Sequence, residues 1–355
     1  MTDTNVQRSI DSIDLQILQL AETRQHLVEQ LTGSLEQGSI GQVAAAAAEI
    51  KKVVQSRPPC DALSRQAQTQ LLKCLSGACL ESVRAMRVAF LGPKYSYSHL
   101  AATKYFGEAV SLTPVGSIPA VFDAVARGDM VAGLVPIENS TDGRVVDTLG
   151  MFIRQDMEIC GEVLLPIHHN LLARTTREKI TEVHSKPQAL SQCRNWLASQ
   201  LPQAKVVENS STAAAAKLAS EKTGVAAVAS IEAGRAYNLD VIDQNIEDNP
   251  NNVTRFAVLG KERPSPTEDD KTALLFQVSH CPGALADAMT IFKQSGLNLT
   301  WIESFPAPET KNEYLFFIEL SGHRDDPPVQ TAIDELTASA QRLDILGSYP
   351  RAVLT

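Results

Sequence analysis

The polar segment Asn252-Val253-Thr254-Arg255-Phe256 stands directly before the apolar run Ala257-Val258-Leu259. A fixed arginine can bind a carboxylate through two parallel hydrogen bonds, and a threonine hydroxyl beside it can donate a proton. The segment therefore predicts a site that binds an anionic group and transfers a proton. A strand that begins with an exposed arginine is the alternative interpretation.

A second polar segment, Glu138-Asn139-Ser140-Thr141, follows closely on the apolar run Val131–Val135. In open α/β sheets, ligands bind outside the carboxyl ends of the strands. We therefore expect Glu138, Asn139 and Ser140 to face a ligand, although a Glu-Asn pair on the surface would produce the same pattern.

Hydroxyl groups stand at the predicted N-termini of two helices, Ser98 in one, and Ser211 and Thr212 in the other. Amides and hydroxyls at a helix N-terminus can bind a carboxylate, but hydroxyl side chains also cap helices without any ligand. Gln188 and Gln192 lie one helical turn apart, so both can face the same site. Glutamines in contact with solvent are the alternative for this pair.

The elements that would position these residues alternate along residues 87–264. Short apolar runs that resemble strands are separated by helical patterns, which predicts an α/β domain with a largely parallel sheet. The predicted strands are Val88–Leu91, Val131–Val135, Val163–Pro166, Val225–Ala229 and Ala257–Leu259. One helix is predicted from Ser98 onward. Three others are predicted over Ile118–Arg127, Pro187–Leu197 and Ser211–Ser220.

The segments on either side show other patterns. Residues 1–86 have apolar residues at three- and four-residue steps, which predicts an all-α domain. Its helices are expected over residues 10–31, 44–54 and 62–84. After a charged segment with two prolines, residues 270–355 show the order strand, helix, strand, strand, helix, strand, which is the ferredoxin-like arrangement. These elements are expected over residues 272–278, 283–294, 297–305, 314–320, 329–340 and 345–348.

The composition sets limits on function. The 355 residues are 44% apolar, which suffices for cores in two or three domains, and the net charge of −9 argues against a nucleic-acid-binding protein. No apolar run approaches the roughly 18 residues of a membrane span, and the N-terminus lacks the features of a secretory signal. The six cysteines form no Cys-x-x-Cys pair, which is typical of reduced thiols. We therefore expect a cytoplasmic protein that binds neither nucleic acid nor membrane. Without a dinucleotide fingerprint or a P-loop, we expect no cofactor and no metal.

Five separated segments occur in the order in which prephenate dehydratases carry them, and this resemblance covers about residues 87–355. They are Gly92-Pro93 with Ser96-Tyr97-Ser98-His99, Pro136-Ile137-Glu138-Asn139-Ser140, Ser185-Lys186-Pro187-Gln188 with Gln192-Cys193, Ser211-Thr212-Ala213-Ala214, and Asn252-Val253-Thr254-Arg255-Phe256. Lys186 stands where the family usually has histidine. The resemblance implies two α/β lobes, like those of periplasmic binding proteins, with the active cleft between them.

The resemblance also implies the roles of individual residues. Thr254 would be the catalytic residue that helps to protonate the leaving hydroxyl of prephenate, and Glu138 or Arg255 would polarise it. The residues expected to bind substrate are Ser98, Asn139, Ser140, Gln192, Ser211, Thr212, Asn252 and Phe256. The product would be phenylpyruvate, formed with loss of water and carbon dioxide.

The C-terminal segment resembles the ACT domain, through which phenylalanine regulates this family. Its first signature, Gly283-Ala284-Leu285, is intact, whereas the second, Glu303-Ser304-Phe305-Pro306, has Phe305 at the position of the family's arginine. The resemblance implies a phenylalanine site between ACT domains of a homodimer or homotetramer. Phe305 weakens the case for phenylalanine feedback without removing it, because the glycine motif is intact. Its residues would be Gly283, Ala284, Leu285, Glu303 and Ser304.

Residues 1–86 resemble the helical chorismate mutase domain that is often fused ahead of this dehydratase. Residues Ile10, Asp11, Ile13, Asp14 and Arg24 match its first helix. Gln7 and Leu35-Glu36, however, stand where the mutase needs cations, and Ala44–Ala48 replaces an Arg-Glu cluster. We therefore expect the mutase to be lost or reduced and the helices to serve dimerisation, unless Lys51, Lys52 or Arg65 substitutes.

Three other functions fit parts of this pattern. They are a bifunctional chorismate mutase/prephenate dehydratase, an arogenate dehydratase, and a regulatory protein that binds a ligand without catalysis. The intact Thr254-Arg255-Phe256 segment speaks against the last, because a sensor needs no proton donor.

Overall fold

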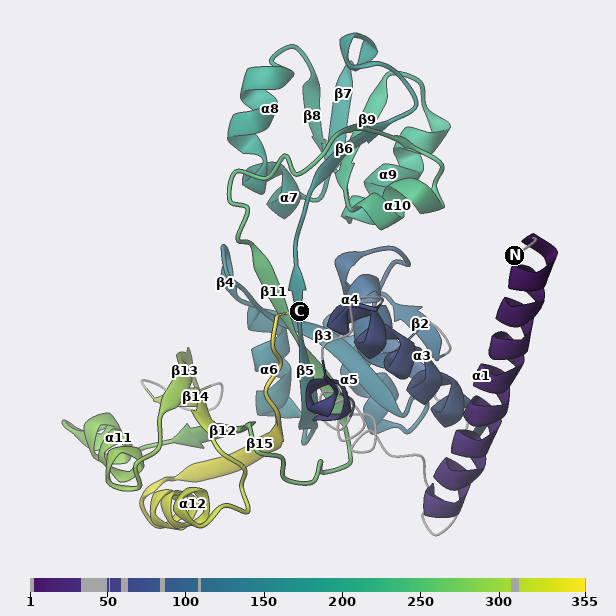
Figure 1. The fold of residues 1–355 in the computed structure, drawn as a ribbon. Coiled ribbons are helices and arrows are strands. Elements are labelled where there is room, and N and C mark those ends of the chain that lie inside the picture. The colour runs from purple at the N-terminus through teal and green to yellow at the C-terminus, as the bar shows by residue number, and fades with distance from the viewer. Residues whose placement is uncertain are drawn as a thin grey trace.

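The computed structural model describes residues 3–32, 50, 52–58, 63–83, 87–107, 110–307 and 313–354. Figure 1 shows a helical N-terminal part, two α/β lobes stacked one above the other, and a C-terminal α+β domain beside the first lobe. The predicted fold class, an α/β protein with two lobes between a helical and a ferredoxin-like part, is confirmed.

The N-terminal part contains helices α1 (Asp3–Thr32) and α3 (Arg65–Val83), which pack against each other. Arg24 of α1 donates a hydrogen bond to Ser76 Oγ at 2.8 Å. The alanine run predicted as a second helix lies outside the described residues, and residues 52–56 just after it are helical. No helix in the described part of the chain is both long and apolar enough to cross a membrane.

The first lobe is built on a sheet with the order β2-β1-β3-β11-β5, with β4 paired to β3. The apolar side chains of β3 and β11 alternate between two buried clusters, one on each face of the sheet. Its strands are β1 (Arg87–Leu91), β2 (Ser111–Val115), β3 (Ala132–Asn139), β4 (Gly143–Arg144), β5 (Glu158–Pro166) and β11 (Val253–Gly260). Its helices are α4 (Tyr97–Phe106), α5 (Ile118–Ala126) and α6 (Val146–Arg154).

The second lobe has the strand order β10-β6-β9-β7-β8. Small residues allow α9 to lie close to β9, because Ala215, Ala216 and Ala219 are buried against a strand that is itself rich in alanine. The strands are β6 (Asn170–Ala173), β7 (Glu182–Ser185), β8 (Lys205–Glu208), β9 (Val225–Ala229) and β10 (Asp240–Asp243). The helices are η1 (Arg177–Lys179), α7 (Pro187–Gln192), α8 (Arg194–Gln200), α9 (Thr212–Glu221) and α10 (Ile231–Ala236).

The prediction of a largely parallel sheet is wrong for both lobes. In the first lobe β11 runs antiparallel to β3 and β5, and in the second lobe β6 runs antiparallel to β9 and β10. In the first lobe the reason is that the chain leaves after β5 and returns along β11. The two connecting segments are hydrogen-bonded to each other, from Ile167 N to Asn252 O and from Ile246 N to His169 O, both at 2.8 Å.

The C-terminal domain has the predicted order of four strands and two helices, which is confirmed. Its antiparallel sheet has the order β13-β14-β12-β15, and both helices pack on one face of it. The strands are β12 (Asp270–Gln277), β13 (Leu299–Pro306), β14 (Tyr314–Ser321) and β15 (Arg342–Pro350), and the helices are α11 (Ala284–Gln294) and α12 (Pro327–Ser339).

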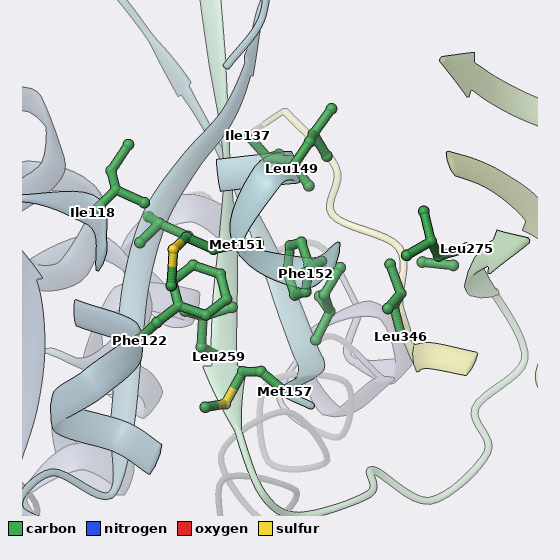
Figure 2. Close-up of a cluster of buried hydrophobic side chains, with 14 of the residues drawn as sticks. Ile118, Phe122, Ile137, Leu149, Met151, Phe152, Met157, Leu259, Leu275 and Leu346 are labelled. Carbon is green, nitrogen blue, oxygen red and sulfur yellow. The ribbon is translucent and has the colours of Figure 1, made fainter. Parts of the chain in front are cut away.

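The other face of this C-terminal sheet shares a single apolar core with the first lobe. Leu275 of β12 and Leu346 of β15 belong to the same buried cluster as Phe122 and Phe152 of the lobe (Figure 2). Phe317 of β14 lies 6.4 Å from the Phe152 ring. Each fully buried leucine or phenylalanine contributes roughly 1.5–3 kcal/mol, so the lobe and the C-terminal domain stabilise each other.

Gly347 allows β15 to approach β5 closely. Its φ is +149°, and an added Cβ would lie 2.2 Å from Ile159 O. We therefore expect Gly347→Ala to destabilise the folded protein by about 1–3 kcal/mol, since both the backbone and the contact must shift. The measurement is urea denaturation of the full chain. As a control, Gly150→Ala has open space around its Cβ, and an equal loss in both variants would contradict this explanation.

Candidate active site

Thr254 lies beside Asn139, because β11 and β3 are paired with Thr254 opposite Asn139 and Arg255 opposite Glu138. Asn139 Nδ2 donates to Thr254 Oγ1 at 2.8 Å. The orientation of the Asn139 amide is determined, since its Oδ1 accepts from the backbone N–H groups of Thr141 and Asp142 at 2.9 and 3.0 Å. Thr254 thus receives a hydrogen bond on its oxygen and keeps its own hydrogen to donate.

Thr254 and Arg255 project from opposite faces of the sheet. Phe256 and Val258 of β11 belong to the core under α4, whereas Ala257 and Leu259 belong to the core shared with the C-terminal domain. By the two-residue alternation of a strand, Thr254 shares the face of Phe256, and Arg255 shares the face of Ala257.

A bulge in β3 places Glu138 on the same face of the sheet as Arg255, and Asn139 on the same face as Thr254. Arg255 is opposite Glu138 but Phe256 is opposite Pro136, so Ile137 is the extra residue. The bulge directs Glu138 toward Arg255, whose Nε donates to Glu138 Oε2 at 3.0 Å, and Asn139 toward Thr254. The predicted contact of Glu138 or Arg255 with Thr254 is therefore corrected: these two residues bind each other on the opposite face.

Three of the other predicted residues meet where the two lobes join. Gln192 Oε1 accepts from Asn252 Nδ2 at 3.0 Å, and Asn252 Oδ1 accepts from Thr141 Oγ1 at 3.1 Å. Ser140 is held against the same strand, because its Oγ accepts from Val253 N at 2.9 Å. Gln192, Asn252 and Ser140 thus surround the start of β11, immediately before Thr254.

Asp142, which the sequence analysis did not select, joins the lobes directly. Gln188 and Gln192 of α7, in the second lobe, both donate to Asp142 Oδ2, at 2.6 and 2.7 Å. The prediction that Gln188 and Gln192 face one site is confirmed by this shared acceptor. Asp142 follows directly on the predicted segment 138–141, so its carboxylate could have been included in the predicted site from the sequence.

A histidine pair in the connecting segment was also missed. The buried His169 lies with Nδ1 2.9 Å from the Tyr97 hydroxyl and Nε2 2.9 Å from Gln192 Oε1. Gln192 Oε1 is an acceptor, because the Gln192 amide donates to Asp142, so His169 Nε2 carries a hydrogen. Glu247 fixes the segment by accepting from His169 N at 2.8 Å and by contacting His168 Nδ1 at 2.7 Å. Two adjacent histidines shortly after a predicted strand could have marked this segment as a site candidate in the sequence.

The buried position of His169 predicts a pH effect. Burial lowers the pKa of His169 below its ordinary value of 6.5, although the Gln192 hydrogen bond opposes this. The unfolded chain therefore binds a proton at a higher pH than the folded one, and stability is lost as the pH falls below about 6.5. We expect the melting temperature of the wild type to fall toward that of His169→Asn between about pH 7.5 and about pH 5.5. A constant difference would mean that His169 does not titrate in this range.

The remaining predicted residues lie elsewhere. Ser96, and not Ser98, caps α4 by accepting from His99 N, while Ser98 is buried in the first turn. Ser211 caps α9 by accepting from Ala214 N at 3.0 Å, and Thr212 follows it. Within the described part of the chain, none of these hydroxyls is hydrogen-bonded to Thr254, whose Oγ1 accepts from Asn139. Phe256 is corrected from a substrate-binding to a core residue, because it is 1% exposed.

The predicted effector residues are divided between a turn and a strand. Gly283 has φ +89° and precedes α11, which begins with Ala284 and Leu285, while Glu303 and Ser304 lie on β13. Glu303 forms an ion pair with Arg144 of β4, and the Arg144 guanidinium lies 5.3 Å from the centre of the Phe305 ring. Phe305 is thus buried at the contact with the first lobe.

Comparison with known proteins identifies related sequences and structures. Residues 88–264 match the family model described as prephenate dehydratase. A bifunctional chorismate mutase/prephenate dehydratase of Pseudomonas aeruginosa is 38% identical over 355 residues, which cover 97% of this chain and 96% of that protein.

Two solved structures have a similar fold. The prephenate dehydratase of Arthrobacter aurescens, solved in complex with L-Phe, is 33% identical with a TM-score of 0.70, and the match covers 76% of this chain and 93% of that one. GqqA, described as a novel type of quorum quenching acylase, is 29% identical with a TM-score of 0.69, covering 75% of this chain and 98% of that one. Because the Pseudomonas relative matches over nearly its whole length, this chain belongs to the prephenate dehydratase family.

Proposed function

We propose that this enzyme converts prephenate to phenylpyruvate, carbon dioxide and water. The bond to the ring carboxylate breaks, its electron pair makes the ring aromatic, and the C–O bond at the opposite ring carbon breaks. The leaving oxygen takes up one proton. The observation that carries the proposal is the Thr254 hydroxyl, which accepts from Asn139 and keeps its hydrogen free to donate to that oxygen.

The substrate would bind between the lobes, next to Thr254. Asn139, Ser140, Gln192 and Asn252 lie around the start of β11, and Ser98, Ser211 and Thr212 are proposed to supply further hydroxyls for the carboxylates. A positioned acid contributes about 10²–10⁴-fold to such a reaction. Glu138 and Arg255 do not polarise Thr254 in this proposal, and instead hold the two strands that carry Thr254 and Asn139.

The test is incubation of the purified full chain with prephenate at neutral pH, with phenylpyruvate measured by its absorbance in alkali. Arogenate is assayed in parallel, with phenylalanine as the product. Rapid formation of phenylpyruvate supports the proposal, whereas turnover of arogenate alone would assign the arogenate reaction. Binding of prephenate without turnover of either compound would make the chain a ligand-binding protein.

Phenylalanine is proposed as the effector, bound by Gly283, Ala284, Leu285, Glu303 and Ser304. The Arthrobacter relative was solved with L-Phe, which supports this. Here Glu303 is already paired with Arg144, so phenylalanine would have to share that carboxylate, and we expect weak binding. Calorimetry and inhibition assays with phenylalanine at millimolar concentration, with leucine as the matched control, test this. Equal heats for both amino acids would contradict a specific site.

The N-terminal helices are proposed to form a homodimer contact, with a homotetramer as the larger assembly. Large apolar side chains are exposed along α1, which a chain does not normally leave in water. They are Val6, Ile10, Ile13, Leu15, Ile17, Leu18, Leu20 and Leu27. We expect the full chain to sediment as a dimer or tetramer and Leu18→Glu with Leu20→Glu to shift it toward the monomer. A monomeric wild type would contradict the proposal.

Chorismate mutase activity is proposed to be lost or reduced in these helices, as the sequence indicates. Arg24, which matches the mutase pattern, is bound within the helix pair to Ser76 Oγ and, at 3.4 Å, to Leu75 O. Consumption of chorismate by the full chain decides this, and turnover comparable to that of prephenate would establish the bifunctional enzyme instead.

We propose that the chain is divided into three units, residues 1–86, 87–264 and 270–355, and that the enzyme is cytoplasmic.

A further inference from the structure

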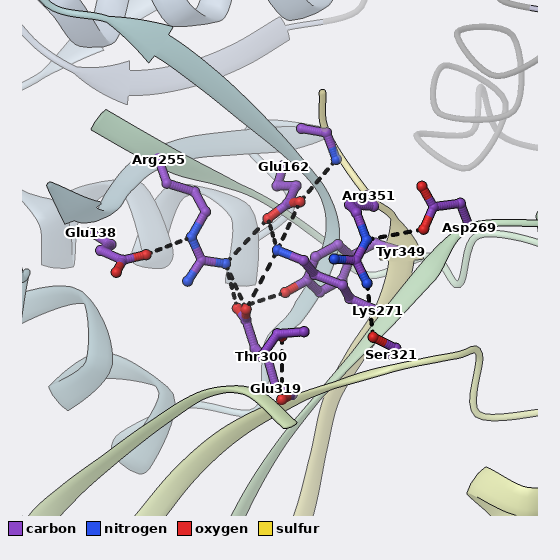
Figure 3. A network of polar contacts seen from close by, with 11 residues as sticks. Glu138, Glu162, Arg255, Asp269, Lys271, Thr300, Glu319, Ser321, Tyr349 and Arg351 are labelled. Atoms are coloured by element: carbon purple, nitrogen blue, oxygen red, sulfur yellow. Dashed lines mark hydrogen bonds and ion pairs between the residues drawn. The ribbon is translucent and has the colours of Figure 1, made fainter. Parts of the chain in front are cut away.

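The side chain of Arg255 is enclosed by the C-terminal domain. Arg255 Nη1 donates to both carboxylate oxygens of Glu319 on β14, at 2.6 and 2.8 Å, and the guanidinium lies 4.6 Å from the centre of the Trp301 ring on β13. Tyr349 of β15 donates to Glu319 Oε1 at 2.9 Å. Lys271 of β12 lies 3.7 Å from Glu319 Oε2. Each strand of the C-terminal sheet therefore contributes one side chain to the surroundings of Arg255. Figure 3 shows Glu319, Tyr349 and Lys271 on the side of Arg255 that faces this sheet.

The buried charges of this cluster are paired across the two domains, each of which contributes one carboxylate and one cation. Glu162 of β5 and Glu319 of the C-terminal domain are the two deeply buried carboxylates, and Arg255 and Lys271 are the two buried cations. Arg255 Nη1 also reaches Glu162 at 3.2 Å, and Lys271 Nζ reaches it at 3.1 Å. Without Glu319, two cations would face one buried carboxylate, with Glu138 at the partly exposed edge.

Burial alone would lower the pKa of Arg255, but the facing Glu319, Tyr349 and Glu162 groups outweigh it and raise the pKa above its ordinary value. Arg255 is therefore held as a cation, and its position depends on where Glu319 lies. Moving a buried cation away from its carboxylates strongly destabilises the folded protein.

The position of Arg255 determines the position of Thr254. The two residues are adjacent on β11, and Arg255 binds Glu138, which is adjacent to Asn139 on β3. A displacement of Arg255 thus moves both partners of the Thr254–Asn139 hydrogen bond. We propose that Glu319 of the C-terminal domain is a positioning residue of the dehydratase site, which acts through Arg255. This inference rests on the dehydratase function proposed above.

A merely structural ion pair would behave differently. If Glu319 only held the domains together, its loss would lower stability and leave the turnover of the remaining folded enzyme unchanged. A matched control exists at the same contact. Arg324 of the C-terminal domain pairs with Glu158 of β5 at 3.1 Å and otherwise donates to Ser348 Oγ of β15, so its hydrogen bonds go to neither a side chain nor the backbone of β11.

The experiment compares Glu319→Gln, Glu319→Asp and Arg324→Met in the full chain, with kcat and KM for prephenate and the melting temperature measured for each. We expect Glu319→Gln to lower kcat by about 10- to 100-fold with little change in KM. Glu319→Asp, which keeps the charge, should recover part of this loss, and Arg324→Met should lower the melting temperature at near-normal kcat.

The outcomes separate the inference from the proposed function. A folded Glu319→Gln variant with normal kcat would overturn the positioning role and leave the dehydratase assignment intact. A wild type that turns over neither prephenate nor arogenate would overturn both. If Glu319→Gln does not fold, Tyr349→Phe removes one hydrogen bond from Glu319 and should lower kcat in the same direction, and normal kcat in that variant would count against the inference.

Discussion

Replacing Thr254 with valine is expected to lower the turnover of prephenate by about 10²–10⁴-fold, the usual contribution of a positioned proton donor. Valine keeps the shape of threonine and removes only the hydroxyl that Asn139 holds at 2.8 Å. The backbone pairing of Thr254 with Asn139 and Leu165 does not involve the side chain, so we expect the fold to remain. The measurement is kcat from the initial rate of phenylpyruvate formation at saturating prephenate.

Thr254→Ser is the matched control, because it retains the hydroxyl and should keep most of the turnover. The circular dichroism spectra and melting temperatures of both variants should be close to those of the wild type. Near-normal kcat in a folded Thr254→Val variant would remove Thr254 from the chemistry. Equal losses in the serine and valine variants would point to the shape of the side chain and not to its hydroxyl.

Arg255→Met is expected to destabilise the folded protein by about 3–5 kcal/mol, the typical result of removing one partner from a buried ion pair. Glu162 and Glu319 would then share Lys271 as their only buried cation. Methionine has a similar length and fills part of the space, so the lost charge should dominate the effect. The measurement is the urea concentration at the midpoint of unfolding, with the melting temperature as a second quantity.

Two variants test whether charge is the cause. In Arg255→Met with Glu319→Met, the pair of Glu162 and Lys271 remains balanced, so the double variant should be no less stable than Arg255→Met alone. Arg351→Gln removes the more exposed pair with Asp269 and should cost less than about 1 kcal/mol. A double variant with simply additive losses would contradict the charge explanation.

Much of the fold could be predicted because its apolar patterns are strong. Strands β9 and β12 and helices α5, α11 and α12 lie within a few residues of their expected positions. Four strands of the second lobe were missed, because they have only four residues each. Such short segments do not establish an alternation, and β7 even buries His184 and Ser185.

The candidate site could be predicted only in part. Thr254, Asn139 and Asn252 were selected because polar residues after or before apolar runs mark the ends of strands, and Gln192 was selected because it lies one helical turn from Gln188. The opposite faces of Thr254 and Arg255 follow from strand alternation and could have been foreseen. The faces on which Glu138 and Asn139 lie could not have been foreseen. They are exchanged by the bulge at Ile137, which has no sequence signature.

The apolar core shared by the first lobe and the C-terminal domain limits how this gene can recombine. A chain break in the proline-bearing segment after β11 looks like a natural point for exchanging one regulatory domain for that of a relative. The exchanged domain would have to fit the Phe122 and Phe152 surface and bring its own carboxylate for Arg255. The two parts are therefore expected to be inherited together. A hybrid gene would need the contact surfaces of the first lobe and of the C-terminal sheet from the same parent, or compensating changes in both.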